Sequence, residues 1–481
     1  MRKSLLLTIA AALILVVSDA FGQGTTTASM RGRVTDTNGE ALIGATVKAV
    51  HQPTGSEWGN VTDFDGYFRL PAVNVGGPYK VTITYVGFET YERDGIYLKL
   101  GQTFNINAEL SESATELEAV VISASEGAII DGNRTGAETF VSQERIQATP
   151  TVARAIGDFA RFNPQASIEE GNDGLSISIG GMNNRYNAIY IDGAVNNDVF
   201  GLAGSGTNGG QTGVSPISID AIEQFQISVA PFDVRKSGFA GGSINAVTRS
   251  GQNETKGSAY YLYRNQDFAG LTPQEEEADF ERERLADFSA QTYGAWVEGA
   301  IIKNKLFYFV SAEFQRDETP QPFQLETYNG DAGREDINAL RNYLNNSWNY
   351  DPGDFENNTA FLNSDKFLAR IDWNINPNNK MTIRHSYTGA ENLEARSSST
   401  GGIRFRQGSE YFVSTTNSSA LELKSTIGNN MSNHLTVGAT LVRDDRDPFG
   451  DPSLRYSLMT AEEDLRSVLR PSPRPTFLIR M

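Results

Sequence analysis

Residues 365–389, DKFLARIDWNINPNNKMTIRHSYTG, contain two runs in which apolar and polar side chains alternate. The apolar positions are Phe367, Ala369, Ile371, Trp373, Ile375, Met381, Ile383 and Tyr387. The polar positions between them are Lys366, Arg370, Asp372, Asn374, Thr382, Arg384, Ser386 and Thr388. A period of two predicts β-strands with one apolar and one polar face, and the residues 376–379 between the runs predict a short turn.

The same alternation recurs in seven segments between residues 256 and 445. The expected connections are long near 269–290, 317–362 and 390–410, and short at 303–304, 376–379 and 429–433. Short turns on one side and long polar loops on the other are typical of transmembrane barrels. We therefore predict a mainly β chain in which residues 253–452 form the first strands of a transmembrane antiparallel β-barrel.

The composition excludes several classes of function. The 481 residues include 41 Lys+Arg against 59 Asp+Glu, and the formal net charge of −18 argues against a nucleic-acid partner. There is no cysteine, and none of the three histidines is followed three residues later by the glutamate that a zinc peptidase would need. We therefore expect no metal site, no cofactor and no enzymatic activity.

The N-terminus has the pattern of a secretory signal peptide, which we assign to residues 1–22. Arg2 and Lys3 precede an apolar run at 5–17, and small residues lead to an expected cleavage site after Gly22. The apolar run is too short to cross a bilayer as a helix, which takes roughly 20 residues. We expect an exported protein without a transmembrane helix.

Residues 28–110 show short strands separated by turn signals. The expected strands lie near 32–34, 45–50, 62–70, 79–86 and 104–110, a spacing that suggests a β-sandwich of about seven strands. The sequence Asp63-Phe64-Asp65-Gly66 could begin a calcium loop, but the later carboxylates of such a loop are missing. A hairpin turn with a positive φ at Gly66 is the favoured interpretation.

This region resembles a known family. The motifs that carry the resemblance are Gly32-Arg33-Val34, Gly44-Ala45-Thr46-Val47, Thr62-Asp63, Gly66-Tyr67-Phe68 and Val81-x-Ile83-x-Tyr85-x-Gly87-Phe88. They are similar to the carboxypeptidase-regulatory-like domain. The resemblance implies a transthyretin-like sandwich without catalytic residues.

The linker at 111–135 contains one short β-prone run between polar segments. The run consists of Leu117, Glu118, Ala119, Val120, Val121, Ile122, Ser123 and Ala124. Such a run can be the last strand of the sandwich, or a strand that the sheet of another protein accepts. Composition alone leaves both interpretations open.

Residues 136–252 are predicted to form an α+β domain rich in glycine. We expect an amphipathic helix that begins at Thr149 and Pro150 and stops at 163–164, because its apolar positions recur on one helical face. Strands are expected at 175–181, 190–193, 224–229 and 242–248, with a loop rich in Gly and Asn at 196–213.

A second resemblance arises from the order of three motifs in this domain. They are 180–187 (GGMNNRYN), 189–193 (IYIDG) and 238–251 (GFAGGSINAVTRSG). They resemble the plug domain of TonB-dependent outer-membrane receptors. A regulatory-like domain ahead of the plug is the arrangement of the Bacteroidetes members, and 232–251 resembles the Oar-like branch.

The resemblance implies a function and partners. It implies a TonB-dependent receptor in the outer membrane of a Gram-negative bacterium that takes up a large extracellular substrate. The run 117–124 lies immediately before the plug and resembles the TonB box, which offers a strand to the periplasmic C-terminal domain of TonB in the TonB-ExbB-ExbD system. Outer-membrane lipid and a surface lipoprotein are further candidate partners. The expected substrate-facing plug residues are Arg185, Tyr186, Asn196 and Asn197.

The barrel is expected to be incomplete. A plugged barrel of about 22 strands would take roughly 600 residues, which this chain does not supply. The atypical tail at 453–481 has five arginines but no glycine or lysine, and we hypothesise that it is cut or read out of frame. The alternative function is a surface adhesin that binds through the sandwich and the loops without transport.

Overall fold

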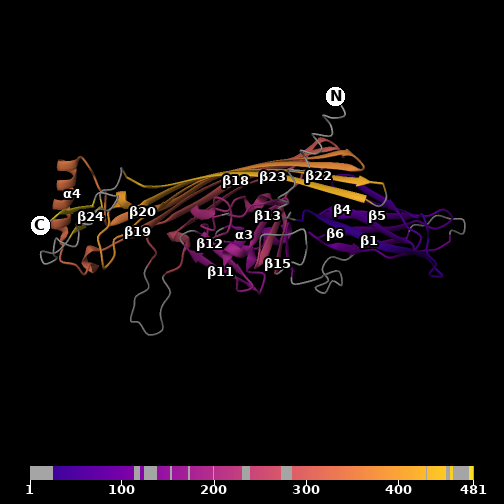
Figure 1. The fold of residues 1–481 in the computed structure, drawn as a ribbon, viewed down its shortest axis with the longest axis horizontal. Coiled ribbons are helices and arrows are strands. Elements are labelled where there is room, and N and C mark those ends of the chain that lie inside the picture. Colours follow the sequence, from indigo (N-terminus) through magenta and orange to yellow (C-terminus); the bar gives the residue numbers. More distant parts are fainter. Residues whose placement is uncertain are drawn as a thin grey trace, which may run out of the picture.

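Three β-rich parts follow one another along the chain (Figure 1). The computed structural model describes residues 25–112, 120–123, 138–151, 154–171, 174–198, 200–229, 239–271, 284–428, 431–450, 455–458 and 476–479. Within these ranges, no helix combines the length and the apolar character needed to cross a membrane. The predicted signal peptide lies outside the described residues.

The first part is a β-sandwich, as predicted. Its strands are β1 (Thr27–Asp36), β2 (Thr46–His51), β3 (Ser56–Val61), β4 (Tyr67–Asn74), β5 (Gly76–Thr84), β6 (Tyr91–Leu98), β7 (Thr103–Asn105), β8 (Ala108–Leu110) and β9 (Val120–Ser123). One sheet has the order β4-β1-β7 with β8 also on β1, and the other has the order β3-β2-β5-β6-β9. Alternate residues such as Met30, Val47 and Ile83 point between the sheets and are fully buried, so apolar burial holds the two layers together.

The turn at Gly66 forms as expected, but it does not close a hairpin. Gly66 has a φ of +78°, and its N–H donates to the Asp63 carbonyl at 3.0 Å. The Asp63 carboxylate accepts the backbone N–H groups of Asp65 and Tyr67. The hairpin prediction was wrong because β3 and β4 belong to different sheets, so the turn is a corner between the two layers.

The second part is the α+β domain whose motifs resemble a receptor plug, and it is called the plug below. Its strands are β10 (Glu138–Ser142), β11 (Ala166–Gly171), β12 (Gly174–Ile179), β13 (Ala188–Ile191), β14 (Ala194–Val195), β15 (Ile222–Val229) and β16 (Gly242–Thr248). A five-stranded sheet has the order β10-β15-β16-β13-β14, and β11 and β12 form a separate pair. In the sheet, β13 pairs with β16 in parallel, which places the residues that follow these two strands at the same edge.

Two short helices, α2 (Gln143–Ala148) and α3 (Ile156–Ala160), replace the single helix predicted from Thr149. Thr149 caps the end of α2, and Arg154 has a positive φ of 49°, which no α-helix contains. The expected apolar face is nevertheless present in α3, where Ile156 and Phe159 are buried in the core of the plug.

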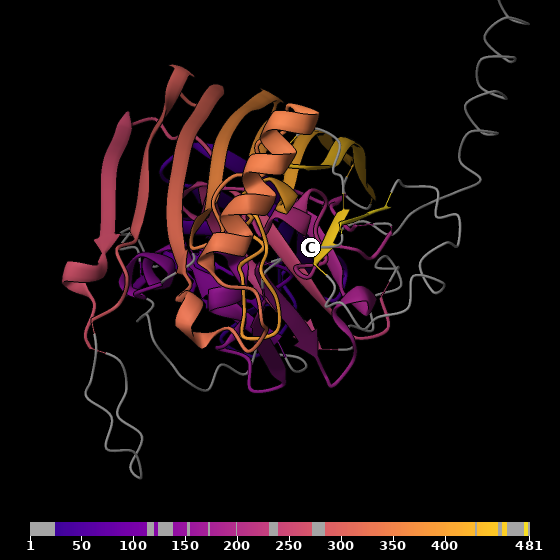
Figure 2. The same cartoon turned by 90° about the vertical axis from the view of Figure 1, so that its left-hand side faces the viewer.

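The third part is a seven-stranded antiparallel sheet, here called the wall. It consists, in chain order, of β17 (Lys256–Asn265), β18 (Ser289–Ile302), β19 (Leu306–Pro322), β20 (Asn357–Asn376), β21 (Asn379–Glu394), β22 (Glu410–Ile427) and β23 (Met431–Pro448). The end-on view shows the wall as an arc with the plug on its inner side (Figure 2). The sheet is not closed, because β17 and β23 are its two edges. The predicted alternation of long and short connections is confirmed.

The burial of side chains in the wall is the reverse of that in a water-soluble sheet. The inward-facing Glu313, Lys366 and Arg384 are at most 6% exposed, whereas the outward-facing Ile371 is 43% exposed. Along β20 and β21, most of the side chains that face the plug are polar, whereas Leu368 of β20 and Phe309 of β19 are inward-facing apolar residues that join the hydrophobic core of the plug. An apolar outer face with a polar inner face is the pattern that a lipid environment favours.

The remaining described elements lie mainly in the connections. They are the helix α4 (Arg334–Trp348), the 3₁₀ turns η2 (Asn184–Tyr186), η3 (Gly210–Thr212), η4 (Ile219–Ala221), η5 (Gln266–Phe268), η6 (Leu325–Thr327) and η7 (Arg406–Gly408), and the strands β24 (Arg455–Leu458) and β25 (Thr476–Ile479). Helix α4 belongs to the long connection between β19 and β20 and buries Ile337, Leu340 and Leu344 on one face.

Candidate functional site: the contact between plug and wall

Asp192 links the plug to the wall. It directly follows β13, and its carboxylate accepts hydrogen bonds from the N–H and the Oγ1 of Thr248 at 2.9 Å each. Arg384 Nε lies 2.9 Å from Asp192 Oδ2, an ion pair without hydrogen-bond geometry. Arg370 lies 3.4 Å from Asp192 Oδ1, donates to the Thr248 carbonyl at 2.6 Å, and pairs with Asp372.

The register of the wall explains why this cluster needs the plug. Arg370 on β20 lies directly opposite Arg384 on β21, on the inner face of the sheet. Like charges in directly opposed positions destabilise a sheet. Two carboxylates, Asp372 from the wall and Asp192 from the plug, balance the two guanidinium groups, and so the wall carries a charge that the plug neutralises.

A second contact involves Arg249, directly after β16. Its guanidinium donates to Glu298 Oε2 on β18 at 2.8 Å, and both residues are buried. The same guanidinium lies 3.6 Å from the ring centre of Trp296, close enough for a cation–π interaction. The end of β16 is thus attached to the first long strand of the wall.

A third contact is centred on Glu313 of β19, which is 2% exposed. Its carboxylate accepts hydrogen bonds from Lys366 Nζ at 3.0 Å, Tyr260 Oη at 2.6 Å and Ser218 Oγ of the plug at 2.8 Å. Arg154 of the plug lies 3.8 Å away. In all three clusters, charged groups of the wall have partners on the plug.

The four predicted substrate-facing residues fall into two pairs. Arg185 and Tyr186 are exposed and share the turn η2. Asn196 is 3% exposed, and its Nδ2 has no hydrogen-bond partner in the described part of the chain. Asn197 accepts the backbone N–H of Ile189 at 2.6 Å. The structure therefore brings Arg185 and Tyr186 to the surface, whereas Asn196 is buried and bonds to Ile189 and Asn208 through its backbone, and the Asn197 side chain bonds to the backbone of the plug.

This plug loop lies toward the end of the wall that carries the long connections. Asn184 of η2 donates to the Gly204 carbonyl at 2.6 Å. Further along the loop, Thr212 accepts a hydrogen bond from Asn392 and Gln211 donates to Asp444. Asn392 and Asp444 are close to the ends of β21 and β23 that are remote from the short turns.

Half of the predicted TonB box lies within the described residues. Val120, Val121, Ile122 and Ser123 form β9, which pairs in parallel with residues 91–94 of β6. Leu117, Glu118, Ala119 and Ala124 lie outside the described residues. The segment is thus an edge strand on the sandwich, which is one of the two interpretations that its composition left open.

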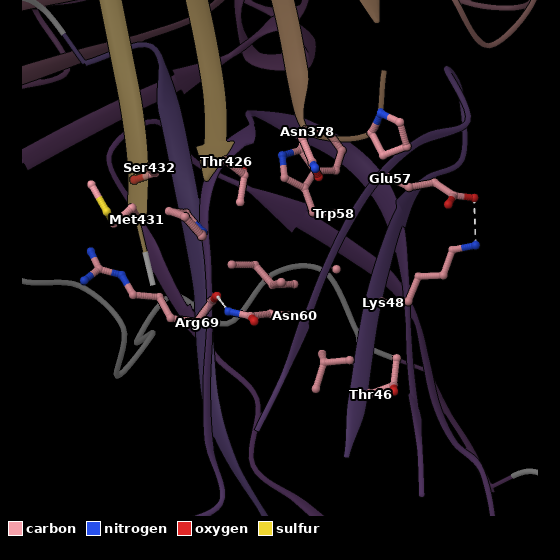
Figure 3. Close-up of a pocket in the computed structure, with 15 residues that line it drawn as sticks. Thr46, Lys48, Glu57, Trp58, Asn60, Arg69, Asn378, Thr426, Met431 and Ser432 are labelled. Carbon is pink, nitrogen blue, oxygen red and sulfur yellow. Dashed lines mark hydrogen bonds and ion pairs between the residues drawn. The ribbon is translucent and has the colours of Figure 1, made fainter. Parts of the chain in front are cut away.

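The sandwich is held against the short-turn end of the wall. Asn374 Nδ2 donates to Ser56 Oγ at 2.8 Å, and Lys380 Nζ donates to the Glu57 carbonyl at 3.0 Å while lying 4.1 Å above the ring of Trp58. A cleft of about 380 Å³ remains between the two parts, lined by residues that include Trp58 and Asn378 (Figure 3).

The plug also contacts the sandwich. Gln224 of β15 accepts the backbone N–H of Leu100 at 2.5 Å, and Asn245 of β16 donates to the Thr25 carbonyl at 2.5 Å. Within the described ranges, no group of three or more His, Asp or Glu residues is arranged to hold a metal ion.

Sequence reasoning missed the three plug–wall clusters. Lys366, Arg370 and Arg384 were predicted on the polar face, but their partners were not identified. The sequence did contain a signal. Charged residues lie on the polar face of the predicted wall strands, and the plug motifs contain the charged residues Asp192 and Arg249. Pairing them requires the position of the plug relative to the wall, which the sequence pattern does not provide.

Comparison with known proteins agrees with this architecture. Family models match in order at residues 29–111 (carboxypeptidase regulatory-like domain), 132–244 (TonB-dependent receptor plug domain) and 247–335 (outer membrane beta barrel domain). The TonB-dependent transporter Oar of Myxococcus xanthus is 30% identical over 314 residues, which are 63% of this chain and 28% of that protein.

Other similar proteins are more distant. An iron-regulated outer membrane virulence protein of Vibrio cholerae is 26% identical over 160 residues, covering 33% of this chain and 24% of that protein. The crystal structure of the outer membrane transporter YddB from Escherichia coli has a TM-score of 0.49 at 16% identity, covering 68% of this chain and 42% of that chain. The matches thus span less than a third of the two curated relatives.

The family models define an outer-membrane receptor with a plug domain and a partial β-barrel. The chain belongs to the TonB-dependent receptors of Gram-negative bacteria, and its regulatory-like domain and its similarity to Oar make it an Oar-like member. The three matched family models describe a regulatory-like domain, a receptor plug and an outer-membrane barrel, and none of these descriptions names an enzymatic activity.

Proposed function

We propose that the chain belongs to an active transporter that takes up a large extracellular substrate and is driven by TonB. The observation that carries the proposal is the polar seat of the plug, in which buried carboxylates and guanidinium groups join it to the wall at Asp192, Arg249 and Glu313. Water can replace such partners when the plug moves, whereas an apolar interface would lose its contacts without compensation.

In this proposal, TonB binds the run 117–124. Addition of an extended strand to the TonB sheet supplies backbone hydrogen bonds along the direction of a pull, and it makes few demands on side chains. The run directly precedes the plug in the chain, and a pull on it is therefore transmitted to β10 and the sheet behind it. The energy would come from the inner membrane through TonB.

Substrate would contact Arg185 and Tyr186, supported by Asn196 and Asn197. The exposure of the first two residues and the position of their loop toward the long connections support this assignment. A cation and a phenol on one turn suit a substrate with anionic or hydrogen-bonding groups.

Binding to TonB tests the proposal without knowledge of the substrate. The purified chain in lipid nanodiscs should capture the periplasmic C-terminal domain of TonB, and deletion of 117–124 should abolish capture. Val121→Pro should also abolish it, because proline disrupts a strand, whereas Val121→Thr should preserve it. Undiminished capture by the deletion variant would refute the assignment.

A further inference from the structure

The strand β9 occupies a defined place on the sandwich. Val120, Val121, Ile122 and Ser123 lie opposite Tyr91, Glu92, Arg93 and Asp94 of β6 in a parallel register. In the order β3-β2-β5-β6-β9, the segment is the outermost strand of its sheet. Among the described residues, no other strand pairs with the outer edge of β9.

The edge of β6 offers space for just such a short strand. On one side, the backbone of Ser111 accepts the N–H of Glu89 at 2.9 Å, and Glu112 forms a β-bridge with Phe88. On the other side, Gly95 has a φ of +70°, and the register between β5 and β6 shifts at this point. A bulge of this kind ends regular pairing. Residues 91–94 therefore form the regular part of the edge, and β9 matches it residue for residue.

The sandwich that carries this edge is itself fixed in place. Ser56 and Glu57 bind the wall at its short turns, and Leu100 binds the plug. The edge of β6 therefore has a defined position relative to the plug. A segment docked on it is presented at the same end of the molecule as the short turns.

A β-strand has two hydrogen-bonding edges, because successive residues direct their N–H and C=O groups to opposite sides. Pairing with β6 occupies one edge of β9 and leaves the other available. A segment already held in extended conformation loses less conformational entropy when a further strand is added. The docked segment is thus prepared for strand addition.

We propose that β6 of the sandwich is the docking site of the TonB-binding segment and presents its outer edge to TonB as a preformed strand. This inference rests on the proposed function of 117–124 and assigns a role to the regulatory-like domain. TonB would add the next strand to the sheet, and the short β6–β9 pairing would then break under the pull.

A disulfide tests the docking directly, because the natural chain has no cysteine. Neighbouring strands lie about 4.8 Å apart, within the Cα–Cα range of a disulfide. The double variant Asp94→Cys/Ser123→Cys should form a cross-link on mild oxidation of the full chain, measured by mass spectrometry. Glu92→Cys/Val121→Cys tests the same register if the first variant fails to fold.

The matched control is Asp94→Cys/Val121→Cys. Its two positions are offset by two residues along the strand, which separates the Cα atoms by about 8 Å and is too far for a disulfide. Equal cross-linking of this control and the in-register pair, or no cross-linking of either in-register pair, would overturn the inference.

The affinity of the chain for the TonB C-terminal domain tests whether docking on β6 presents β9 to TonB as a preformed strand. The cross-linked chain should bind at least as tightly as its reduced form, and about tenfold more tightly than a free peptide of residues 117–124. A tenfold weaker affinity after cross-linking would show that β6 competes with TonB, and an affinity equal to that of the peptide would show that docking has no effect. Either result would overturn the inference.

The two proposals fail in different ways. If the deletion of 117–124 leaves capture of TonB unchanged, the TonB-binding role is wrong, even if the register-specific cross-link forms. If the deletion abolishes capture but no in-register cross-link forms, the TonB-binding role stands and the docking on β6 is wrong.

Discussion

One carboxylate of the plug, that of Asp192, lies between two arginines of the wall. Arg370 and Arg384 are directly opposed on neighbouring strands, and Asp192 is within 3.4 Å of both. Removal of one partner from a buried ion pair leaves a charge without compensation, which typically costs about 3–5 kcal/mol. The plug should therefore depend strongly on this residue.

We predict that Asp192→Asn lowers the opening free energy of β13 and β16 by about 3 kcal/mol or more, because Arg384 loses its carboxylate partner. Hydrogen exchange of the two strands in lipid nanodiscs measures this energy. The control is Asp445→Asn, which removes the exposed pair with Arg443 and should cost less than about 1 kcal/mol. Unchanged exchange in Asp192→Asn would contradict the proposed importance of the cluster.

His51 is a second residue with a measurable effect, this time in the sandwich. Burial lowers the pKa of His51 from 6.5 to about 4. The ring bonds to Thr54 through Nδ1 at 2.7 Å, and Thr54 donates to Ser56, which accepts from Asn374 of the wall. The neutral imidazole is thus part of a chain of hydrogen bonds that reaches the wall.

Because the unfolded state binds a proton below pH 6.5 and the folded state does not until about pH 4, stability should fall as the pH decreases between these values. We predict a loss of about 2 kcal/mol for the sandwich between pH 7 and pH 5. His51→Asn should remove this part of the pH dependence. Urea unfolding of both proteins at several pH values measures it, and parallel pH profiles would contradict the assignment.

At the level of the strands, one glycine of the plug motif explains how β16 packs against its neighbours. A Cβ on Gly242, the first residue of β16, would lie 2.5 Å from Ile179 Cγ2 and 2.8 Å from the Ser228 carbonyl oxygen. The backbone of Gly242 does not have a positive φ, so space rather than backbone conformation requires glycine here.

Gly242→Ala should therefore destabilise the plug by about 1–3 kcal/mol through overpacking. The control is Gly270→Ala, since a Cβ there meets no atom within 4 Å. Thermal unfolding followed by near-ultraviolet circular dichroism compares the two. Equal midpoints for both variants would show that β16 can shift away from β12 and β15 at little cost.

Strands with strong alternation were predictable, and elements defined by their neighbours were not. Wall strands such as β19 to β22 follow from period-two patterns because one face of each packs toward the interior and the other forms the outer face. By contrast, β3 and β6 contain glycine and charged residues and lack a clear pattern, and they form because β2 and β5 offer edges to pair with. The predicted helix at 149–163 failed because Arg154 interrupts it.

At the scale of the whole molecule, the order of parts was predictable and their contacts were not. Motifs at 180–193 and 238–251 indicated the plug, and the inward charges of the wall indicated a polar interior. The pairing of Asp192 with Arg384, and of Ser56 with Asn374, joins residues 192 and 318 positions apart in sequence. Such pairs depend on how the three parts are arranged relative to one another, which no local pattern encodes.

The central claim is that the wall has lipid on its outer face and the plug on its inner face. Single spin labels placed in turn at residues 366–376 of the cysteine-free chain, in lipid vesicles, test it most directly through electron paramagnetic resonance accessibility. We predict high oxygen accessibility at 367, 369, 371 and 373 and low accessibility to both oxygen and a water-soluble nickel complex at 366, 370 and 372. High accessibility to the nickel complex on both faces would contradict the claim.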